Sequence, residues 1–243
     1  MNYTLVNRVL LHLSKKCNLS CKHCYATSYD GVDSFSYDFS QLQRTLLSFN
    51  KPVDITGGEP FLFSNLKKFI ETCTMQGIRI SSIFTNGTLI EKNLDIVDYL
   101  KENNPNMQFY VSLDGFHESH DRFRGNGSFE LALNGATILK SRGFKVFINS
   151  ILHKNIHFSD LENLYNEIQV RSFDRWRIDT PFNSGNWKKN RHNDNLSLIK
   201  TFEYFNYVLN IWLDDNKRFE LEIDHVLKYI NGQFYFIDRY SEN

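Results

Sequence analysis

Residues 8–26 read RVLLHLSKKCNLSCKHCYA, and the interpretation of the whole chain starts from this stretch. It holds three of the four cysteines, Cys17, Cys21 and Cys24, spaced C-x3-C-x2-C directly after an apolar run. Chance produces this pattern in on the order of one in a thousand random chains of this composition. A secreted disulfide framework spreads an even set of cysteines through a small chain. The cluster therefore indicates a metal site in a reducing compartment.

Three thiolates on one tight loop suit zinc or an iron-sulfur cluster. A closed structural zinc site needs a fourth protein ligand, and the sequence has no second C-x2-C pair. His12 or His23 could complete such a site. A four-iron four-sulfur (4Fe-4S) cluster held by three cysteines instead leaves one iron open for chemistry. The loop alone leaves both interpretations open.

Length and composition predict one main core in a cytoplasmic protein. The chain has 243 residues, of which 41% are hydrophobic and 23% charged. Lys plus Arg equals Asp plus Glu, at 28 each, so no overall field favours nucleic acid or an acidic membrane. The amino-terminal apolar run is too short for a signal segment, and nowhere do about 18 apolar residues run together. We expect neither nucleic acid nor membrane as a partner.

Short apolar or β-branched runs alternate with amphipathic helical patterns along the chain, which indicates repeated βα units and a parallel sheet. Each run is followed by a polar or glycine-containing loop and then a helix. Six strands are predicted, at residues 8–13, 53–56, 78–85, 107–114, 145–152 and 173–180.

Two helices carry clear signals of where they begin and which face they bury. Ser40 with Gln43, and Ser159 with Glu162, fit capping boxes. Apolar residues follow the i, i+3, i+4, i+7 spacing of a buried helical face at Leu66, Phe69, Ile70, Cys73 and at Leu161, Leu164, Tyr165, Ile168. This spacing predicts that Cys73 is a buried apolar side chain rather than a ligand.

The last fifth of the chain is predicted to be helical. Residues 181–195 are polar and indicate a mobile loop at the strand ends. Two helical patterns follow, the first with Phe202, Phe205, Leu209 and Trp212, the second with Ile223, Val226, Leu227 and Ile230. No terminal element is expected after them. We divide the chain into a core at residues 1–195 and a helical extension at 196–243 that packs on it.

Three more motifs each follow a predicted strand: TGGEP at residues 56–60, TNG at 85–87 and SLDG at 112–115. With the cysteine motif, their order resembles the radical S-adenosylmethionine (SAM) superfamily, over roughly residues 9–179. The resemblance implies a partial TIM-type (β/α)6 barrel with C-terminal helices, one 4Fe-4S cluster on the three cysteines, and SAM as second cofactor. In a parallel barrel all four motifs fall on the face formed by the carboxyl ends of the strands.

Glycine lets a backbone approach a ligand closely, which suits Gly57 and Gly58 to a binding loop. By the resemblance this loop meets the SAM amino group, and Glu59 receives or orients that charge. The alternative for Glu59 is a solvated loop carboxylate. Thr85 and Asn86 of the TNG motif belong to the same cofactor site.

Residues 111–125, VSLDGFHESHDRFRG, resemble peptide- and protein-modifying members, both sulfatase-maturating enzymes and SPASM-type enzymes with cysteine-rich carboxy-terminal extensions. The resemblance implies that Ser112 and Arg124 hold the SAM carboxylate, for which the planar Arg fork is suited. Asp114 then orders the loop or contacts the ribose, and Asn149 lies near the nucleoside. For Ser112 the alternative is a strand-end hydroxyl bonded to the backbone, and for Arg124 it is a surface arginine on a loop.

Two features depart from the family pattern. His23 stands where many members carry Tyr or Phe against the adenine; an imidazole can also stack there, and Tyr25 is adjacent. No cysteine follows Cys73, so the auxiliary-cluster cysteines of SPASM-type enzymes are missing. The chain is either a short member or cut before such an extension, and we expect one cluster only.

The resemblance implies an enzyme that reductively cleaves SAM to a 5'-deoxyadenosyl radical, which abstracts hydrogen from a peptide or protein. An electron donor such as flavodoxin or ferredoxin is the expected partner. Asp179, at the end of the sixth strand, is the candidate on the substrate side, the alternative being a salt-bridged loop residue. Three other functions remain open: a glycyl-radical activase, a small-molecule radical SAM enzyme, and a non-catalytic zinc-binding barrel.

Overall fold

The computed structural model describes residues 8–26, 39–194, 196–216, 218–223, 227–230 and 233–236. Its strands form one sheet in the order β1 to β9, parallel from β1 to β7 and antiparallel from β7 to β9. The strands are β1 (Val9–His12), β2 (Val53–Thr56), β3 (Ile80–Thr85), β4 (Gln108–Ser112), β5 (Lys145–Ile151), β6 (Arg175–Asp179), β7 (Glu220–Ile223), β8 (Leu227–Ile230) and β9 (Gln233–Phe236). The predicted α/β fold and parallel sheet are confirmed.

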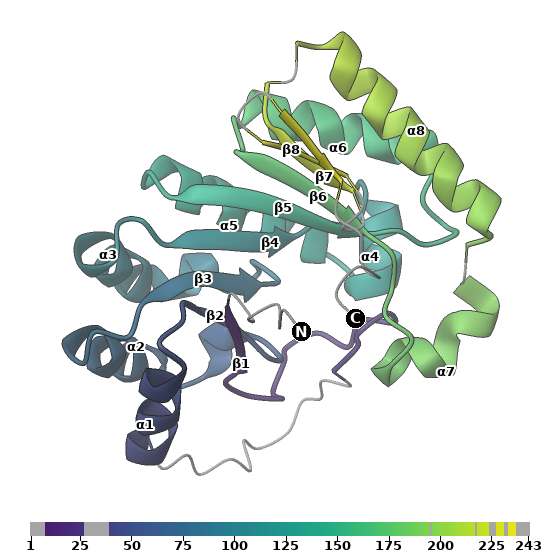
Figure 1. Ribbon diagram of the computed structural model, residues 1–243. Coiled ribbons are helices and arrows are strands. Elements are labelled where there is room, and N and C mark those ends of the chain that lie inside the picture. The colour runs from purple at the N-terminus through teal and green to yellow at the C-terminus, as the bar shows by residue number, and fades with distance from the viewer. Residues whose placement is uncertain are drawn as a thin grey trace, which may run out of the picture.

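Helices alternate with the strands, as expected of a partial TIM-type barrel (Figure 1). The α-helices are α1 (Phe39–Phe49), α2 (Leu66–Met75), α3 (Leu94–Asn103), α4 (Glu118–Arg124), α5 (Ser128–Ser141), α6 (Phe158–Val170), α7 (Gly185–Asp194) and α8 (Leu198–Asp214). Two short 3-10 helices are η1 (Pro60–Leu62) and η2 (Ile90–Asn93). Within the described ranges, no helix has the length and apolar character needed to cross a membrane.

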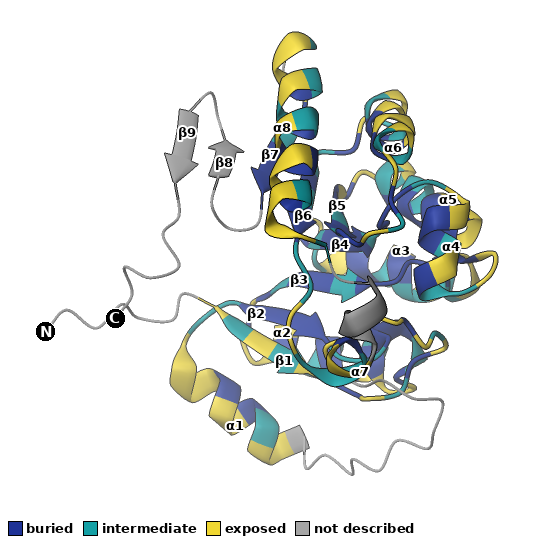
Figure 2. Ribbon diagram, turned by 90° about the vertical axis from the view of Figure 1, so that its right-hand side faces the viewer, coloured by how far each residue is buried: buried dark blue, intermediate teal, exposed yellow. Residues whose placement is uncertain are grey.

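The two faces of the sheet have different chemistry because side chains alternate along each strand. On β4, Phe109 and Val111 are fully buried on the face where α5 packs. Tyr110 and Ser112 lie on the other face. Figure 2 shows the buried residues concentrated in the strands and on the helix faces that meet them. One face thus builds the apolar core, and the other is left for polar and aromatic side chains.

The predicted helix faces of α2 and α6 are confirmed, since all eight apolar residues of the two patterns are buried. Cys73 is completely buried in the apolar core, as its spacing predicts. The capping boxes are wrong. Helix α6 follows His157, whose backbone N–H donates to the Asp160 carboxylate at 2.8 Å. Helix α1 begins at Phe39, so Ser40 lies inside its first turn.

The predictions for the carboxy-terminal region need correction. Residues 185–194 form α7 instead of a loop. The second helical pattern is not a helix: Ile223 ends β7, Leu227 and Ile230 bound β8, and Val226 lies outside the described residues. The open edge of β6 explains this, because its backbone groups gain partners when β7 pairs with it. A further strand, β9, lies where no element was expected.

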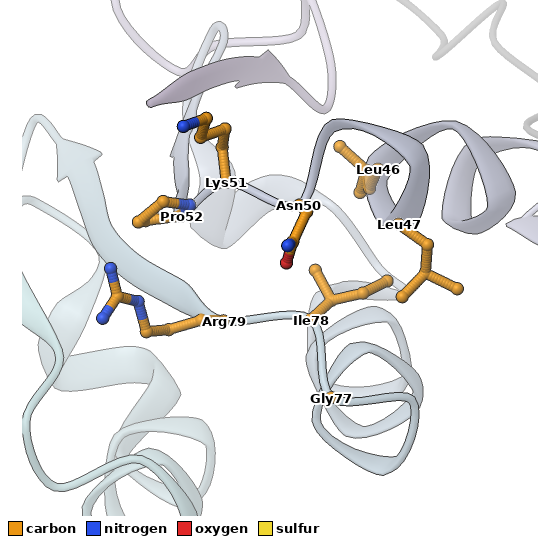
Figure 3. A pocket seen from close by; sticks show the side chains of 8 residues that line it. All are labelled: Leu46, Leu47, Asn50, Lys51, Pro52, Gly77, Ile78 and Arg79. Atoms are coloured by element: carbon orange, nitrogen blue, oxygen red, sulfur yellow. The ribbon is translucent and has the colours of Figure 1, made fainter. Parts of the chain in front are cut away.

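A small pocket lies at the amino-terminal ends of β2 and β3 (Figure 3). Its volume is about 160 Å³, and it is lined by Leu46, Leu47, Asn50, Lys51, Pro52, Gly77, Ile78 and Arg79. Ligand pockets usually measure about 300–1,000 Å³. Parallel barrels carry their sites at the opposite, carboxyl end of the strands. The pocket is therefore not the functional site.

Gly135 on α5 provides a test of how the helix layer supports the TNG loop. A Cβ at Gly135 would lie 2.2 Å from the Gly87 carbonyl oxygen. We expect Gly135→Ala to lower the free energy of unfolding by about 2 kcal/mol in urea denaturation, although alanine favours helix more than glycine. The control is Leu131→Ala, at a half-exposed position of α5, which should cost less than about 1 kcal/mol. Equal stability of Gly135→Ala and the parent would contradict this packing.

Candidate functional site

The predicted site residues gather at the carboxyl ends of the parallel strands. The cysteine loop follows β1, the TGGEP loop follows β2, the TNG loop ends β3 and the SLDG loop ends β4. In Figure 1 the arrowheads of β3, β4 and β5 point towards α4, and the segment after β1 and α7 lie at the same end. The four motifs thus converge on one edge of the sheet.

The cysteine loop carries three thiols that could serve as metal ligands. Cys17 and Cys21 are buried, Cys24 is half-buried, and none of the three forms a disulfide. Burial raises the pKa of the Cys17 thiol and raises that of Cys21 to about 12. Across the described ranges, no three His, Cys, Asp or Glu side chains converge on one ion. Three cysteine thiols can each bind a separate iron of a 4Fe-4S cluster, so the chemistry of this donor set fits such a cluster.

The TGGEP loop packs directly on the segment that leads into the cysteines. The Gly58 N–H donates to the Ser14 carbonyl at 2.7 Å, and the Glu59 N–H donates to the Lys16 carbonyl at 2.8 Å. A Cβ at Gly58 would lie 2.0 Å from the Lys16 carbonyl oxygen. Gly58 therefore serves this backbone-to-backbone contact, a role that the sequence did not indicate.

Glu59 is a fully buried link between the second and third loops. Its Oε1 accepts from the Thr85 hydroxyl at 2.7 Å and from the Phe61 N–H at 3.1 Å. Its Oε2 accepts from the Asn86 N–H at 2.7 Å. Burial raises the pKa of Glu59 to about 7 against the opposing effect of these hydrogen bonds. The alternative of a solvated carboxylate is excluded by this burial.

The Asn86 side chain reaches from the TNG loop to the cysteine loop. Its Nδ2 donates to Asn18 Oδ1 at 2.9 Å and to the Cys17 Sγ at 3.7 Å. Its Oδ1 accepts from the N–H of Thr88 at 3.0 Å and from the hydroxyl of Thr88 at 2.7 Å. Asn18 Nδ2 in turn donates to the Thr88 hydroxyl at 2.8 Å. The three side chains form a closed ring of hydrogen bonds beside the first cysteine.

Asp114 organises the fourth loop from a fully buried position. It accepts from Arg124 Nε at 2.6 Å and from Arg124 Nη2 at 2.8 Å. The His23 Nε2 lies 2.7 Å away, and the Ile151 N–H donates at 3.0 Å. Burial alone would raise the pKa of Asp114, but Arg124 and His23 outweigh it and hold this pKa well below its usual range. Arg124 is a buried ion-pair partner, not a surface residue.

The two aromatic candidates for the adenine differ in exposure. His23 is buried, next to Asp114 and edge-on to Phe123 at 5.9 Å between ring centroids. Tyr25 is 40% exposed and makes an edge contact with Phe182. A flat ligand needs an accessible ring face, so the geometry favours Tyr25 over His23.

A polar row crosses the open face of the sheet. The register pairs Ser112 with Asn149, Asn149 with Arg177, and Arg177 with Glu222. The Asn149 Oδ1 is buried, and the described part of the chain offers it no hydrogen-bond donor. Such an acceptor suits a ligand that brings its own donor. Asp179 is buried beside this row, with its Oδ2 2.7 Å from Arg177 Nε, in agreement with the salt-bridge alternative.

Comparison with known proteins agrees with this geometry. Residues 11–168 match the model of the radical SAM superfamily. The chain belongs to this superfamily. Members use a 4Fe-4S cluster and SAM. The three buried or half-buried thiols fit the cluster, and the Asn149 oxygen, to which the described residues offer no donor, fits a bound ligand.

The relatives of this radical SAM chain include a synthase of an iron porphyrin and a bacteriocin biosynthesis protein. It is 29% identical over 244 residues to the Fe-coproporphyrin III synthase of Methanosarcina barkeri, covering 97% of this chain and 59% of that protein. It is 28% identical to the subtilosin biosynthesis protein AlbA of Bacillus subtilis, covering 66% and 37%. Streptococcus suis SuiB bound to SAM shares the fold, with a TM-score of 0.74, 18% identity and coverage of 90% and 50%. The chain thus spans about half the length of such relatives.

The radical SAM cysteine loop is also held by a segment that sequence reasoning missed. The Asn186 N–H donates to the Cys24 carbonyl at 2.8 Å, and Asn186 Nδ2 donates to the Cys21 carbonyl at 3.1 Å. The Ser184 hydroxyl donates to the Tyr25 carbonyl at 3.0 Å. Gly185, at φ +56°, passes so close that a Cβ would lie 2.4 Å from the Cys24 carbonyl oxygen. No local pattern could reveal contacts between segments so far apart in sequence.

Two buried histidines complete the surroundings of Asp114. His120 Nδ1 accepts from the Asp114 N–H at 3.1 Å, and His153 stacks on Phe123 with ring centroids 3.4 Å apart. Burial lowers the pKa of each histidine to about 3. Both are therefore neutral packing residues at ordinary pH.

Gly58→Ala tests the contact between the TGGEP loop and the cysteine loop. The added methyl group cannot fit against the Lys16 carbonyl, so the cysteine loop must move. We expect the affinity of the protein for the cluster iron to fall at least about tenfold. Less iron is then bound after anaerobic reconstitution. Leu131→Ala, at a half-exposed position of α5, is the control and should keep the iron content of the parent. Full iron content in Gly58→Ala would contradict the role assigned to this glycine.

The pKa of Glu59 predicts a pH dependence of stability. Between about 4.5, the ordinary value, and about 7, the folded chain keeps a proton that the unfolded chain releases. The stabilising contribution is therefore complete below this window and is lost as pH rises through it. Compared with Glu59→Gln, the parent's free energy of unfolding should fall by up to about 3 kcal/mol from pH 4.5 to 7.5. Urea denaturation of both proteins at four pH values measures this. If the difference between their free energies of unfolding does not change with pH, the raised pKa of Glu59 is refuted.

Proposed function

We propose that this chain is the catalytic part of a radical SAM enzyme that modifies a peptide or protein. The observation that carries the proposal is the convergence of four loops on one edge of the sheet, one of which carries Cys17, Cys21 and Cys24. These three thiols would hold the single cluster. When bound, the cluster would supply the electron for reductive cleavage of SAM into methionine and a 5'-deoxyadenosyl radical, the species that would abstract hydrogen from the substrate.

The loops would bind SAM through groups that are already in position. Glu59 fixes the TGGEP loop, so that backbone groups of Gly57 and Gly58 receive the SAM amino group; Thr85 and Asn86 hold Glu59 from the other side. Arg124 would reach the SAM carboxylate with Nη1, the nitrogen that Asp114 does not take, together with the Ser112 hydroxyl.

The nucleoside would lie over the open face of the sheet. Asn149 Oδ1 is placed to accept from the nucleoside, because the described residues leave it without a donor. Tyr25 would stack on the adenine, with His23 supporting the loop from below. Of the two roles for Asp114, its burial and four polar neighbours favour ordering the loop over touching the ribose.

Relatives support a peptide or protein substrate. AlbA is named for bacteriocin subtilosin biosynthesis, and one SuiB structure holds the precursor peptide SuiA, with a TM-score of 0.75 to this chain. Asp179 is our candidate on the substrate side, held by Arg177 at the edge of the polar row. A flavodoxin or ferredoxin would supply the electron. We keep residues 1–195 as the core and 196–243 as an extension, whose β7 joins the core sheet.

A small-molecule substrate is the second candidate. The relative that matches 97% of this chain is named a synthase of Fe-coproporphyrin III. Arg175 and Arg177 on the open face, each paired with acidic residues of β6 or β7, offer positive charge to an anionic substrate. A peptide substrate and a small-molecule substrate can be told apart by which compound stimulates SAM cleavage.

The test is an anaerobic reconstitution with iron and sulfide, followed by addition of SAM and dithionite. We expect a brown protein that releases 5'-deoxyadenosine, and complete loss of both in Cys21→Ala. Cys73→Ala, which removes a core thiol, should keep the colour. A peptide substrate predicts faster 5'-deoxyadenosine release with candidate precursor peptides than with tetrapyrrole precursors of iron coproporphyrin III. A colourless protein with stoichiometric zinc would refute the radical mechanism.

A further inference from the structure

We propose that the Asn86 side chain is a positioning residue that donates a hydrogen bond to the Cys17 thiolate and so raises the reduction potential of the cluster. The inference rests on the proposed function, because it requires the cluster on Cys17. It assigns to the TNG motif a task directed at the cluster ligand itself. The Asn86 Nδ2 lies 3.7 Å from the Cys17 Sγ.

The orientation of the Asn86 amide follows from its partners. The Thr88 backbone N–H can only donate, so the atom that faces it at 3.0 Å must be the Asn86 oxygen. The amide nitrogen then points the other way, towards Asn18 and Cys17. One N–H is used by the Asn18 oxygen at 2.9 Å, which leaves the second for the sulfur.

Hydrogen bonds to the Asn86 backbone and side chain hold the amide in one orientation. The Asn86 backbone N–H is fixed on the buried Glu59 carboxylate. The Thr88 hydroxyl donates to Asn86 Oδ1 and accepts from Asn18, which closes the ring. Only 8% of Asn86 is exposed, so water does not compete for the sulfur. A fixed donor in a dry site acts more strongly than a mobile one.

An N–H directed at a cluster thiolate stabilises the state with more negative charge, which is the reduced cluster. Hydrogen bonds to the sulfurs are among the factors that set the reduction potential of such clusters. The Leu19 N–H, 3.4 Å from the same sulfur, belongs to the cysteine loop itself. Asn86 lies in the loop after β3, and substitution there leaves the sequence of the cysteine loop unchanged.

The experiment is a redox titration of the reconstituted cluster, followed by electron paramagnetic resonance without SAM, so that a lost SAM contact cannot alter the result. At a fixed potential we expect Asn86→Leu to lower the ratio of reduced to oxidised cluster about fivefold. Asn86→Asp keeps the acceptor for Thr88 but faces the thiolate with negative charge, and should lower the ratio further. The control Thr72→Val removes an exposed hydroxyl on α2, outside the ring of hydrogen bonds, and should match the parent within about twofold.

A second measurement uses the unaltered residue, in case the Asn86 variants hold no cluster. Asparagine labelled with ¹⁵N in the side-chain amide should show a hyperfine coupling to the reduced cluster in the parent and in Asn18→Ala. Absence of this coupling, or unchanged potentials in both Asn86 variants, overturns the inference. Failure of the parent to form a cluster instead overturns the proposed function, so the two failures are distinct.

Discussion

The buried carboxylate of Glu59 is the interaction on which the site depends. It accepts three hydrogen bonds, from Phe61, Thr85 and Asn86, and its own backbone N–H binds Lys16 beside the cysteines. A buried carboxylate without partners would be severely destabilising. The fold is therefore more stable when the second and third loops stay close enough to share this carboxylate. Because the cysteine loop rests on the same residue, three of the four motifs are positioned together.

Asp114 does the same for the other half of the site. Arg124 binds it with two nitrogens, and the last residue of β5, Ile151, donates its backbone N–H. Two buried carboxylates, Glu59 and Asp114, thus hold the loops at this edge of the sheet. Both are satisfied by the protein itself, so the loops are ordered before any ligand arrives. Such preorganisation is what positions a cofactor for chemistry, since no reorganisation is needed when it binds.

The division of the sheet into two faces explains where the chemistry can occur. Phe109 and Val111 point into the core, whereas Ser112 and Asn149 point to the open face at the carboxyl ends of their strands. Asn186 at the start of α7 closes one side by binding carbonyls of the cysteine loop. Asp179 ends β6, and the segment that follows it is thus bound directly to the cysteine loop.

The sequence by itself determined the six strands, the buried faces of α2 and α6, the burial of Cys73 and the motifs that meet at the strand ends. These depend on periodicity and on residues a few positions apart. Only the tertiary structure decided that Gly58 faces backbone, that Glu59 is a buried link, that Asn186 holds the cysteine loop, and that residues 220–223 form a strand. Such features depend on partners from 27 to 165 residues away, or on an open strand edge, and no local pattern encodes which distant group will be there.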